Sequence, residues 1–161
     1  MPGGSSGQES IYNGLKAAEK IAGGEKSIVL IHDGVRPLIN EKTITDNIES
    51  VKKHGSSITC VKVKETVLVV AEDNSIEDVP NRADTPQSFY LDEIIGAHRK
   101  AMAENKYDFI DSCSMMQYYG KKLYLIEGPQ ENIKITTPDD FYTMRALLDA
   151  KEEAQIYGLD D

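Results

Sequence analysis

The chain has 161 residues, of which 40% are hydrophobic, and a formal net charge of −9 at pH 7. This length suffices for one buried core, so we expect a single domain over residues 1–161. The negative charge opposes attraction to nucleic acid and anionic membranes, and no apolar run is long enough to span a bilayer. The sequence therefore predicts a cytoplasmic protein without nucleic-acid or membrane partners.

The first half of the chain alternates between helical and strand patterns. Apolar residues recur at helical spacing from Ile11 to Ala22, and the pair Gly23-Gly24 ends that pattern. An apolar strand is expected over 27–31, then a helix capped by Asn40 that ends near Gly55, then a strand over 57–63. This β-α-β order predicts a parallel strand pair with a right-handed crossover.

The second half begins with a β-rich stretch broken by Glu72-Asp73-Asn74-Ser75, which predicts a hairpin-like arm over about 62–84. Residues 85–89 are interpreted as a rigid turn because they begin Thr-Pro. A helix over 91–102, a short helix after Asp111 and short strands over 123–126 and 133–135 should follow. Thr137 as N-cap, then Pro138, predicts the start of a closing helix.

Chemistry is most strongly indicated where the first strand ends, at Asp33 and Arg36. In α/β proteins ligands settle outside the carboxyl ends of strands. Asp33 could bind Mg²⁺ while Arg36 binds a phosphate through two hydrogen bonds. Alternatively, Asp33 could cap the turn and form only an ion pair with Arg36. Lys134 lies in an otherwise apolar stretch and should have an anionic partner, such as phosphate, unless it faces solvent from an edge strand.

Several motifs in this order resemble the cytidylyltransferases that act on methylerythritol phosphate and ribitol phosphate. The resemblance implies an α/β fold, a Rossmann-like nucleotidyltransferase sheet with helices on both faces and a protruding β-arm. It also implies that CTP and a sugar-alcohol phosphate react, with Mg²⁺ on the triphosphate, to give a CDP-alcohol and pyrophosphate. The matching motifs are Gly3-Gly4 through Ser10, His32-Asp33-Gly34-Val35-Arg36-Pro37, Lys64-Glu65-Thr66, Asn81-Arg82, Thr85-Pro86-Gln87-Ser88-Phe89 and Glu131-Asn132-Ile133-Lys134-Ile135-Thr136.

The resemblance also implies roles for particular residues. Asp33 would lie where the metal and the substrates meet, and Asp33, Arg36 and Lys134 would be the catalytic residues. The cytidine would contact the opening loop, and the acceptor phosphate and polyol would be surrounded by residues from several motifs. The implied cytidine contacts are Gly4, Ser5 and Ser10, with Gly34 allowing close backbone approach, and the implied acceptor contacts are Arg36, Thr66, Arg82, Thr85 and Lys134. The family's β-arm crosses to a second subunit, which implies a homodimer in which Thr66 and Arg82 complete the neighbour's site.

Two departures from the family pattern qualify these expectations. The sequence starts at a point about one third of the way along the sequence of a typical family member. The family's amino-terminal β-α units and their glycine-rich loop therefore have no counterpart in this chain. Because that loop supplies an arginine and a lysine to the triphosphate, the chain alone is expected to be nearly inactive. The interval between Arg82 and Thr85 is also shorter than in the family. A noncatalytic dimerisation or nucleotide-binding module is therefore the alternative, and the motifs leave the acceptor open.

Overall fold

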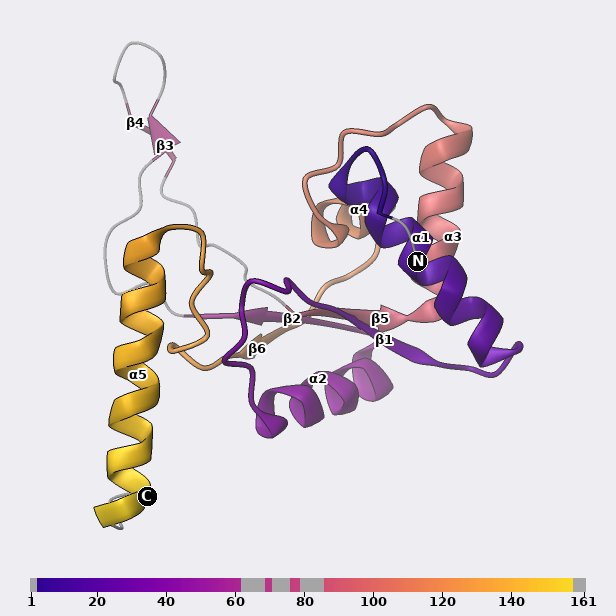
Figure 1. Ribbon diagram of the computed structural model, residues 1–161. Coiled ribbons are helices and arrows are strands. Elements are labelled where there is room, and N and C mark those ends of the chain that lie inside the picture. The colour runs from indigo at the N-terminus through magenta and orange to yellow at the C-terminus, as the bar shows by residue number, and fades with distance from the viewer. Residues whose placement is uncertain (1–2, 62–68, 71–75, 79–85, 158–161) are drawn as a thin grey trace.

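The computed structural model describes residues 3–61, 69–70, 76–78 and 86–157. Their main element is a four-stranded sheet in the order β1-β5-β2-β6, formed by β1 (Ile28–Ile31), β5 (Gln87–Tyr90), β2 (Ser56–Cys60) and β6 (Leu125–Glu127). Helices α1 (Gly7–Ala22), α3 (Leu91–Ala103) and α4 (Ser112–Tyr118) cover one face, and α2 (Glu41–His54) covers the other (Figure 1). The expected α/β sheet with helices on both faces is confirmed.

The strand pairing differs from the expected β-α-β pair. Strands β1 and β2 both pair antiparallel with β5, so they run in the same direction but are not hydrogen-bonded neighbours. The only parallel pair in the described sheet joins β2 to β6. The predicted turn at 85–89 was wrong for its second half, because Gln87–Tyr90 forms the strand that separates β1 from β2. The predicted strand over 133–135 was also wrong, since those residues form no strand.

Capping residues fix the helix ends where the sequence predicted them. The side chain of Asn40 accepts a hydrogen bond from the backbone N–H of Thr43, and Gly55 ends α2 in the left-handed region with a φ of 84°. Asp111 caps α4 in a reciprocal box with Ser114. Helix α5 (Pro138–Tyr157) begins after Thr137, whose hydroxyl accepts from the backbone N–H of Asp140. These local signals are short-range, which is why the sequence reveals them.

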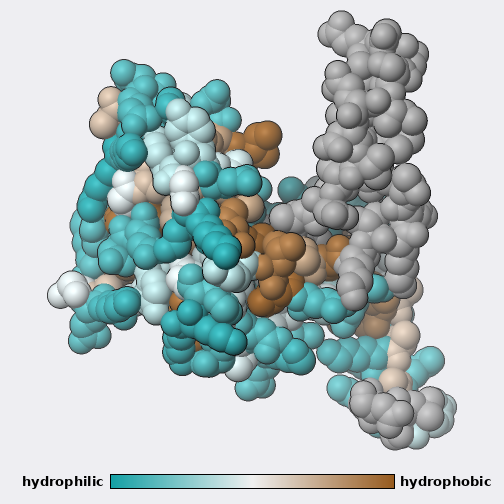
Figure 2. Space-filling view, turned by 180° about the vertical axis from the view of Figure 1, so that it is seen from behind, coloured by the Kyte–Doolittle hydropathy of each residue, from teal (hydrophilic) through white to brown (hydrophobic). Residues whose placement is uncertain are grey.

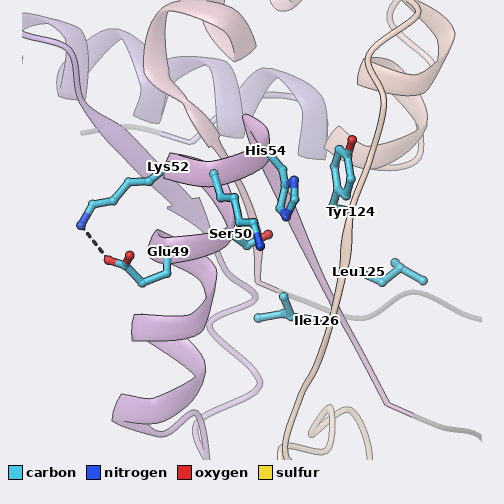
Figure 3. A pocket seen from close by; sticks show the side chains of 8 residues that line it. Glu49, Ser50, Lys52, His54, Tyr124, Leu125 and Ile126 are labelled. Atoms are coloured by element: carbon cyan, nitrogen blue, oxygen red, sulfur yellow. Dashed lines mark hydrogen bonds and ion pairs between the residues drawn. The ribbon is translucent and has the colours of Figure 1, made fainter.

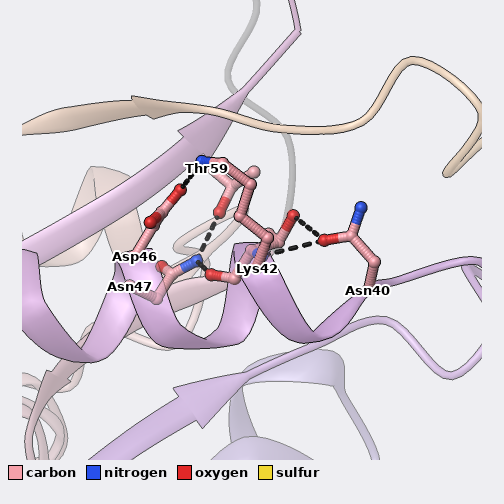
Figure 4. A network of polar contacts seen from close by, with 6 residues as sticks. Asn40, Lys42, Asp46, Asn47 and Thr59 are labelled. Carbon is pink, nitrogen blue, oxygen red and sulfur yellow. Dashed lines mark hydrogen bonds and ion pairs between the residues drawn. The ribbon is translucent and has the colours of Figure 1, made fainter. Parts of the chain in front are cut away.

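The apolar core lies between the sheet and the layer of α1, α3 and α4. Phe89 of β5 and Ile58 of β2 are fully buried there against Ile94 and Ile95 of α3 and Met115 of α4. The opposite face of the same strands is polar. Asn47 of α2 donates to the hydroxyl of Thr59 at 2.9 Å (Figure 4). It also accepts from the hydroxyl of Ser88 at 2.9 Å, and all three residues are buried.

The expected arm is described only in part. Strands β3 (Val69–Val70) and β4 (Ile76–Asp78) pair antiparallel in a separate two-stranded sheet, as the hairpin prediction requires. The other residues of the interval 62–84 lie outside the described residues. Within the described ranges, no helix is both long enough and apolar enough to cross a membrane.

His98 of α3 provides a pH-dependent contribution to stability. It is buried, and burial lowers its pKa from 6.5 to about 4. Because the unfolded state takes up the proton first, stability should fall as the pH drops from about 6.5 towards about 4. Denaturant titrations should show a loss of about 2 kcal/mol from this group between roughly pH 7.5 and pH 5. The variant H98Q should lose this part of the slope, whereas H54Q, at an exposed histidine, should keep it.

Candidate active site

The loop that follows β1 forms a compact turn between Asp33 and Arg36. The backbone N–H of Arg36 donates to the carbonyl oxygen of Asp33 at 3.0 Å, and Nε of Arg36 lies 3.5 Å from Oδ2 of Asp33. The ring of His32 supports the same turn, since its Nε2 lies 2.8 Å from the carbonyl oxygen of Arg36. The Arg36 side chain is only 15% exposed, so its guanidinium is held in one place.

A second segment, about a hundred residues later in the chain, lies beside this turn. Nη1 of Arg36 donates to the carbonyl oxygen of Asn132 at 3.1 Å, and the backbone N–H of Ile135 donates to the carbonyl oxygen of Val35 at 2.8 Å. These bonds place Nζ of Lys134 3.7 Å from Oδ2 of Asp33. The three predicted catalytic residues Asp33, Arg36 and Lys134 therefore meet, and we call them the Asp33 cluster.

The charges of the Asp33 cluster suit phosphate chemistry. One carboxylate faces two cations, so the cluster keeps an excess positive charge that can attract a phosphate. Lys134 was expected to have an anionic partner, and that partner is the Asp33 carboxylate. The same carboxylate pairs with Arg36, as the alternative interpretation of the turn predicted. Both cations contact the same oxygen, Oδ2. The lysine is 49% exposed, so an incoming anion can reach it from solvent.

The side chains around Asp33 can be compared with the ligands that the predicted Mg²⁺ would need. No group of three or more His, Cys, Asp or Glu side chains that could hold a metal ion occurs within the described ranges. Mg²⁺ is commonly bound by one or two carboxylates together with substrate phosphates and water. The 37%-exposed carboxylate of Asp33 fits that pattern as a single protein ligand.

The predicted cytidine-binding residues lie where the opening loop meets the first turn of α1, with Gly4 and Ser5 in the loop and Ser10 in the helix. The hydroxyl of Ser10 accepts from the N–H of Gly4 at 2.9 Å and donates to the carbonyl oxygen of Ser6, while the N–H and hydroxyl of Ser5 both donate to the carboxylate of Glu9. A Cβ on Gly4 would lie 2.5 Å from Cβ of Glu9, so only glycine fits there. The hydrogen bonds of Gly4 and Ser5 thus join the opening loop to Ser10 and Glu9 in the first turn of α1.

The remaining predicted residues divide into two groups. Gly34 lies in the Asp33 turn, and a Cβ built on it would meet no protein atom within 4 Å, which leaves open space beside the backbone. Thr66, Arg82 and Thr85 lie outside the described residues. The sequence assigned no role to Asn132, although its carbonyl oxygen anchors Arg36. Its place in the Asn-Ile-Lys-Ile-Thr motif, two residues before Lys134, is the signal that could have identified it.

A pocket at the opposite end of the sheet contains none of the predicted residues. It lies between the end of α2 and the start of β6, where the rings of His54 and Tyr124 stack with centroids 4.2 Å apart (Figure 3). Its lining includes Glu49, Lys52 and Leu125. A different groove adjoins the Asp33 cluster and is lined by Pro37, Leu38, Glu131 and, on α5, Leu147 and Leu148.

Comparison with known proteins identifies one family. Residues 1–150 match the family model described as 2-C-methyl-D-erythritol 4-phosphate cytidylyltransferase. The chain is 52% identical to a ribitol-5-phosphate cytidylyltransferase of Streptococcus agalactiae serotype V, with 99% of this chain and 68% of that protein covered. It is 41% identical to a 2-C-methyl-D-erythritol 4-phosphate cytidylyltransferase of Clostridium novyi, over 92% of this chain and 64% of that protein.

A solved structure gives the same result. The crystal structure of 4-diphosphocytidyl-2C-methyl-D-erythritol synthase from Anaerococcus prevotii superposes with a TM-score of 0.80 at 29% identity. The match covers 91% of this chain and 68% of that structure. The fold resemblance inferred from the sequence motifs is thereby confirmed.

Proposed function

Because this chain belongs to the 2-C-methyl-D-erythritol 4-phosphate cytidylyltransferase family, we propose that it transfers CMP from CTP to a sugar-alcohol phosphate with release of pyrophosphate. The observation that carries the proposal is the meeting of Asp33, Arg36 and Lys134 at one point. Two cations beside one carboxylate offer a place for two anionic reactants, the acceptor phosphate and the nucleotide. Such chemistry requires positioning and charge neutralisation rather than a covalent intermediate with the enzyme.

In this proposal each member of the Asp33 cluster has a separate task. Arg36 and Lys134 hold the acceptor phosphate so that its oxygen can attack the α-phosphorus of CTP in line with the leaving pyrophosphate. The Asn132 carbonyl and the carboxylate of Asp33 fix the guanidinium of Arg36 before the substrate arrives. Asp33 would hold Mg²⁺, which would supply positive charge beside the phosphates. Gly4, Ser5 and Ser10 contact the cytidine, and Gly34 admits the nucleotide close to the backbone.

We further propose that the acceptor is ribitol 5-phosphate. This chain is 52% identical to the ribitol-5-phosphate enzyme of Streptococcus agalactiae and 41% identical to the methylerythritol phosphate enzyme of Clostridium novyi. Pyrophosphate release with CTP and Mg²⁺ should be at least about tenfold faster with ribitol 5-phosphate than with 2-C-methyl-D-erythritol 4-phosphate, a difference of about 1.4 kcal/mol. The ratio of the two rates is the readout, since it does not depend on the amount of active protein. Equal rates, or a preference for the methylerythritol compound, would contradict this assignment.

We also propose a cytoplasmic homodimer formed through the β-arm, with Thr66 and Arg82 reaching the neighbour's site. Two observations support a second subunit. Strands β3 and β4 form a two-stranded sheet, which is only marginally stable on its own. Helix α5 buries no side chain and exposes Phe141, Tyr142 and Leu148. Apolar side chains also gather in one region of the otherwise mostly hydrophilic face in Figure 2.

A further inference from the structure

Asn132 is buried beside the Asp33 cluster in a way that the fold alone does not explain. The residue is only 5% exposed, yet its side-chain oxygen Oδ1 has no hydrogen-bond partner within the described part of the chain. Its backbone is fully engaged, because its N–H donates to the carbonyl oxygen of Pro129 and its carbonyl oxygen accepts from Arg36. The side-chain oxygen therefore contributes no hydrogen bond to the described part of the fold.

An unpaired buried amide destabilises a protein, whereas a leucine of similar shape would carry no such penalty. Polar groups that remain unsatisfied in a native fold call for an explanation, and binding a ligand is one. The position favours this explanation. Asn132 stands two residues before Lys134, and its own carbonyl oxygen touches the guanidinium of Arg36.

The kind of atom left unpaired indicates the kind of ligand. Oδ1 of Asn132 is an acceptor, so its partner must bring a hydrogen atom. A fully ionised phosphate has no hydrogen to offer this oxygen, but the hydroxyl groups of a polyol have.

We propose that the amide oxygen of Asn132 accepts a hydrogen bond from a hydroxyl group of the sugar-alcohol acceptor and so determines specificity for a polyol chain. This inference rests on the proposed function and deepens it. Arg36 and Lys134 supply donors to the phosphate end of the acceptor, and Asn132 supplies an acceptor to its hydroxyl end.

The test is calorimetric binding of ribitol 5-phosphate and of inorganic phosphate to the protein and to N132L. The variant should bind ribitol 5-phosphate about tenfold more weakly and inorganic phosphate within about twofold of the original affinity. Its thermal unfolding midpoint should be unchanged or raised, because the unpaired amide is gone. An analogue of ribitol 5-phosphate that lacks the paired hydroxyl should bind the two proteins equally. N13L, the same substitution on α1, should leave all these values unchanged.

Other outcomes would decide against the inference. Unchanged binding of ribitol 5-phosphate by N132L would overturn it and leave the proposed function standing. An equal loss for ribitol 5-phosphate and inorganic phosphate would overturn it too, because Asn132 would then act only through the position of Arg36. If the unsubstituted protein bound neither compound, the proposed acceptor site itself would fail.

Discussion

Replacing Asp33 by asparagine should lower kcat about 100-fold or more and leave the acceptor bound at least as tightly as before. The substitution keeps the shape of the side chain but removes the charge that would hold Mg²⁺ in the proposed mechanism. It also removes the carboxylate that lies 3.5 Å from Arg36 and 3.7 Å from Lys134. Both cations are then more attractive to a phosphate. The expected signature is therefore a split, in which turnover is lost but acceptor affinity is retained or improved.

Two measurements check this expectation. The ratio of steady-state pyrophosphate release between D33N and the unsubstituted protein gives the change in kcat whatever the absolute rate, and calorimetry with ribitol 5-phosphate gives the acceptor Kd without requiring turnover. The matched control is D46N, which removes the carboxylate of the exposed Lys42–Asp46 ion pair on α2 (Figure 4). Surface pairs of this kind contribute little, so D46N should match the unsubstituted protein. If D33N kept its turnover, or lost acceptor binding together with turnover, the role proposed for Asp33 would be wrong.

The Asp33 cluster shows what sequence reasoning can reach at a functional site. Asp33 and Arg36 stand three residues apart at a strand end, so their encounter is a local property of the turn. Lys134 was assigned to the same site by family resemblance, because no periodicity relates residues a hundred positions apart. The hydrogen bond from Ile135 to Val35 that brings Lys134 to Asp33 joins two backbones. Such a bond does not depend on the identity of the side chains, so the sequence does not reveal it. The unpaired amide of Asn132 could be recognised only from its burial.

The fold divides in the same way between local and non-local features. Helix caps at Asn40 and Thr137 were predicted because a cap and its partner are three residues apart. The insertion of β5 between β1 and β2 was missed because Gln87 and Ser88 are polar and follow a Thr-Pro pair. In the fold, Gln87 bonds to Asp111 and Cys113, and Ser88 bonds to Asn47, so both polar side chains are satisfied in the interior.

Helix α5 is a helix whose start was predicted but whose packing was not. The sequence predicted its start at Thr137, but none of its side chains is buried, and Phe141 is 50% exposed. Local signals set where a helix begins, whereas its burial depends on what packs against it. Long helices in water generally need tertiary packing to be stable. The exposed face of α5 is thus a property that no local pattern in one sequence could reveal.

Replacing Phe89 by alanine should destabilise the protein by about 3–5 kcal/mol. Phe89 is fully buried at the centre of β5, opposite Val29 of β1 and Ser56 of β2, and it packs in the core beneath α1, α3 and α4. The cavity left by its ring cannot collapse easily because strands lie on both sides. A loss of this size is a large part of the roughly 5–15 kcal/mol that holds a typical domain together. Urea titration measures it directly.

The same substitution on α5 gives the matched control. F141A removes a half-exposed ring and should cost less than about 1 kcal/mol. If F89A does not fold, F89L keeps most of the buried volume, should cost about 1 kcal/mol and remains measurable. The comparison also separates the two interpretations of residues 85–89. A ring at the end of a surface turn would be as dispensable as Phe141, so a small loss in F89A would contradict the central strand. A large loss confined to Phe89 is what the order β1-β5-β2-β6 requires, because β5 is then the strand through which both β1 and β2 are joined.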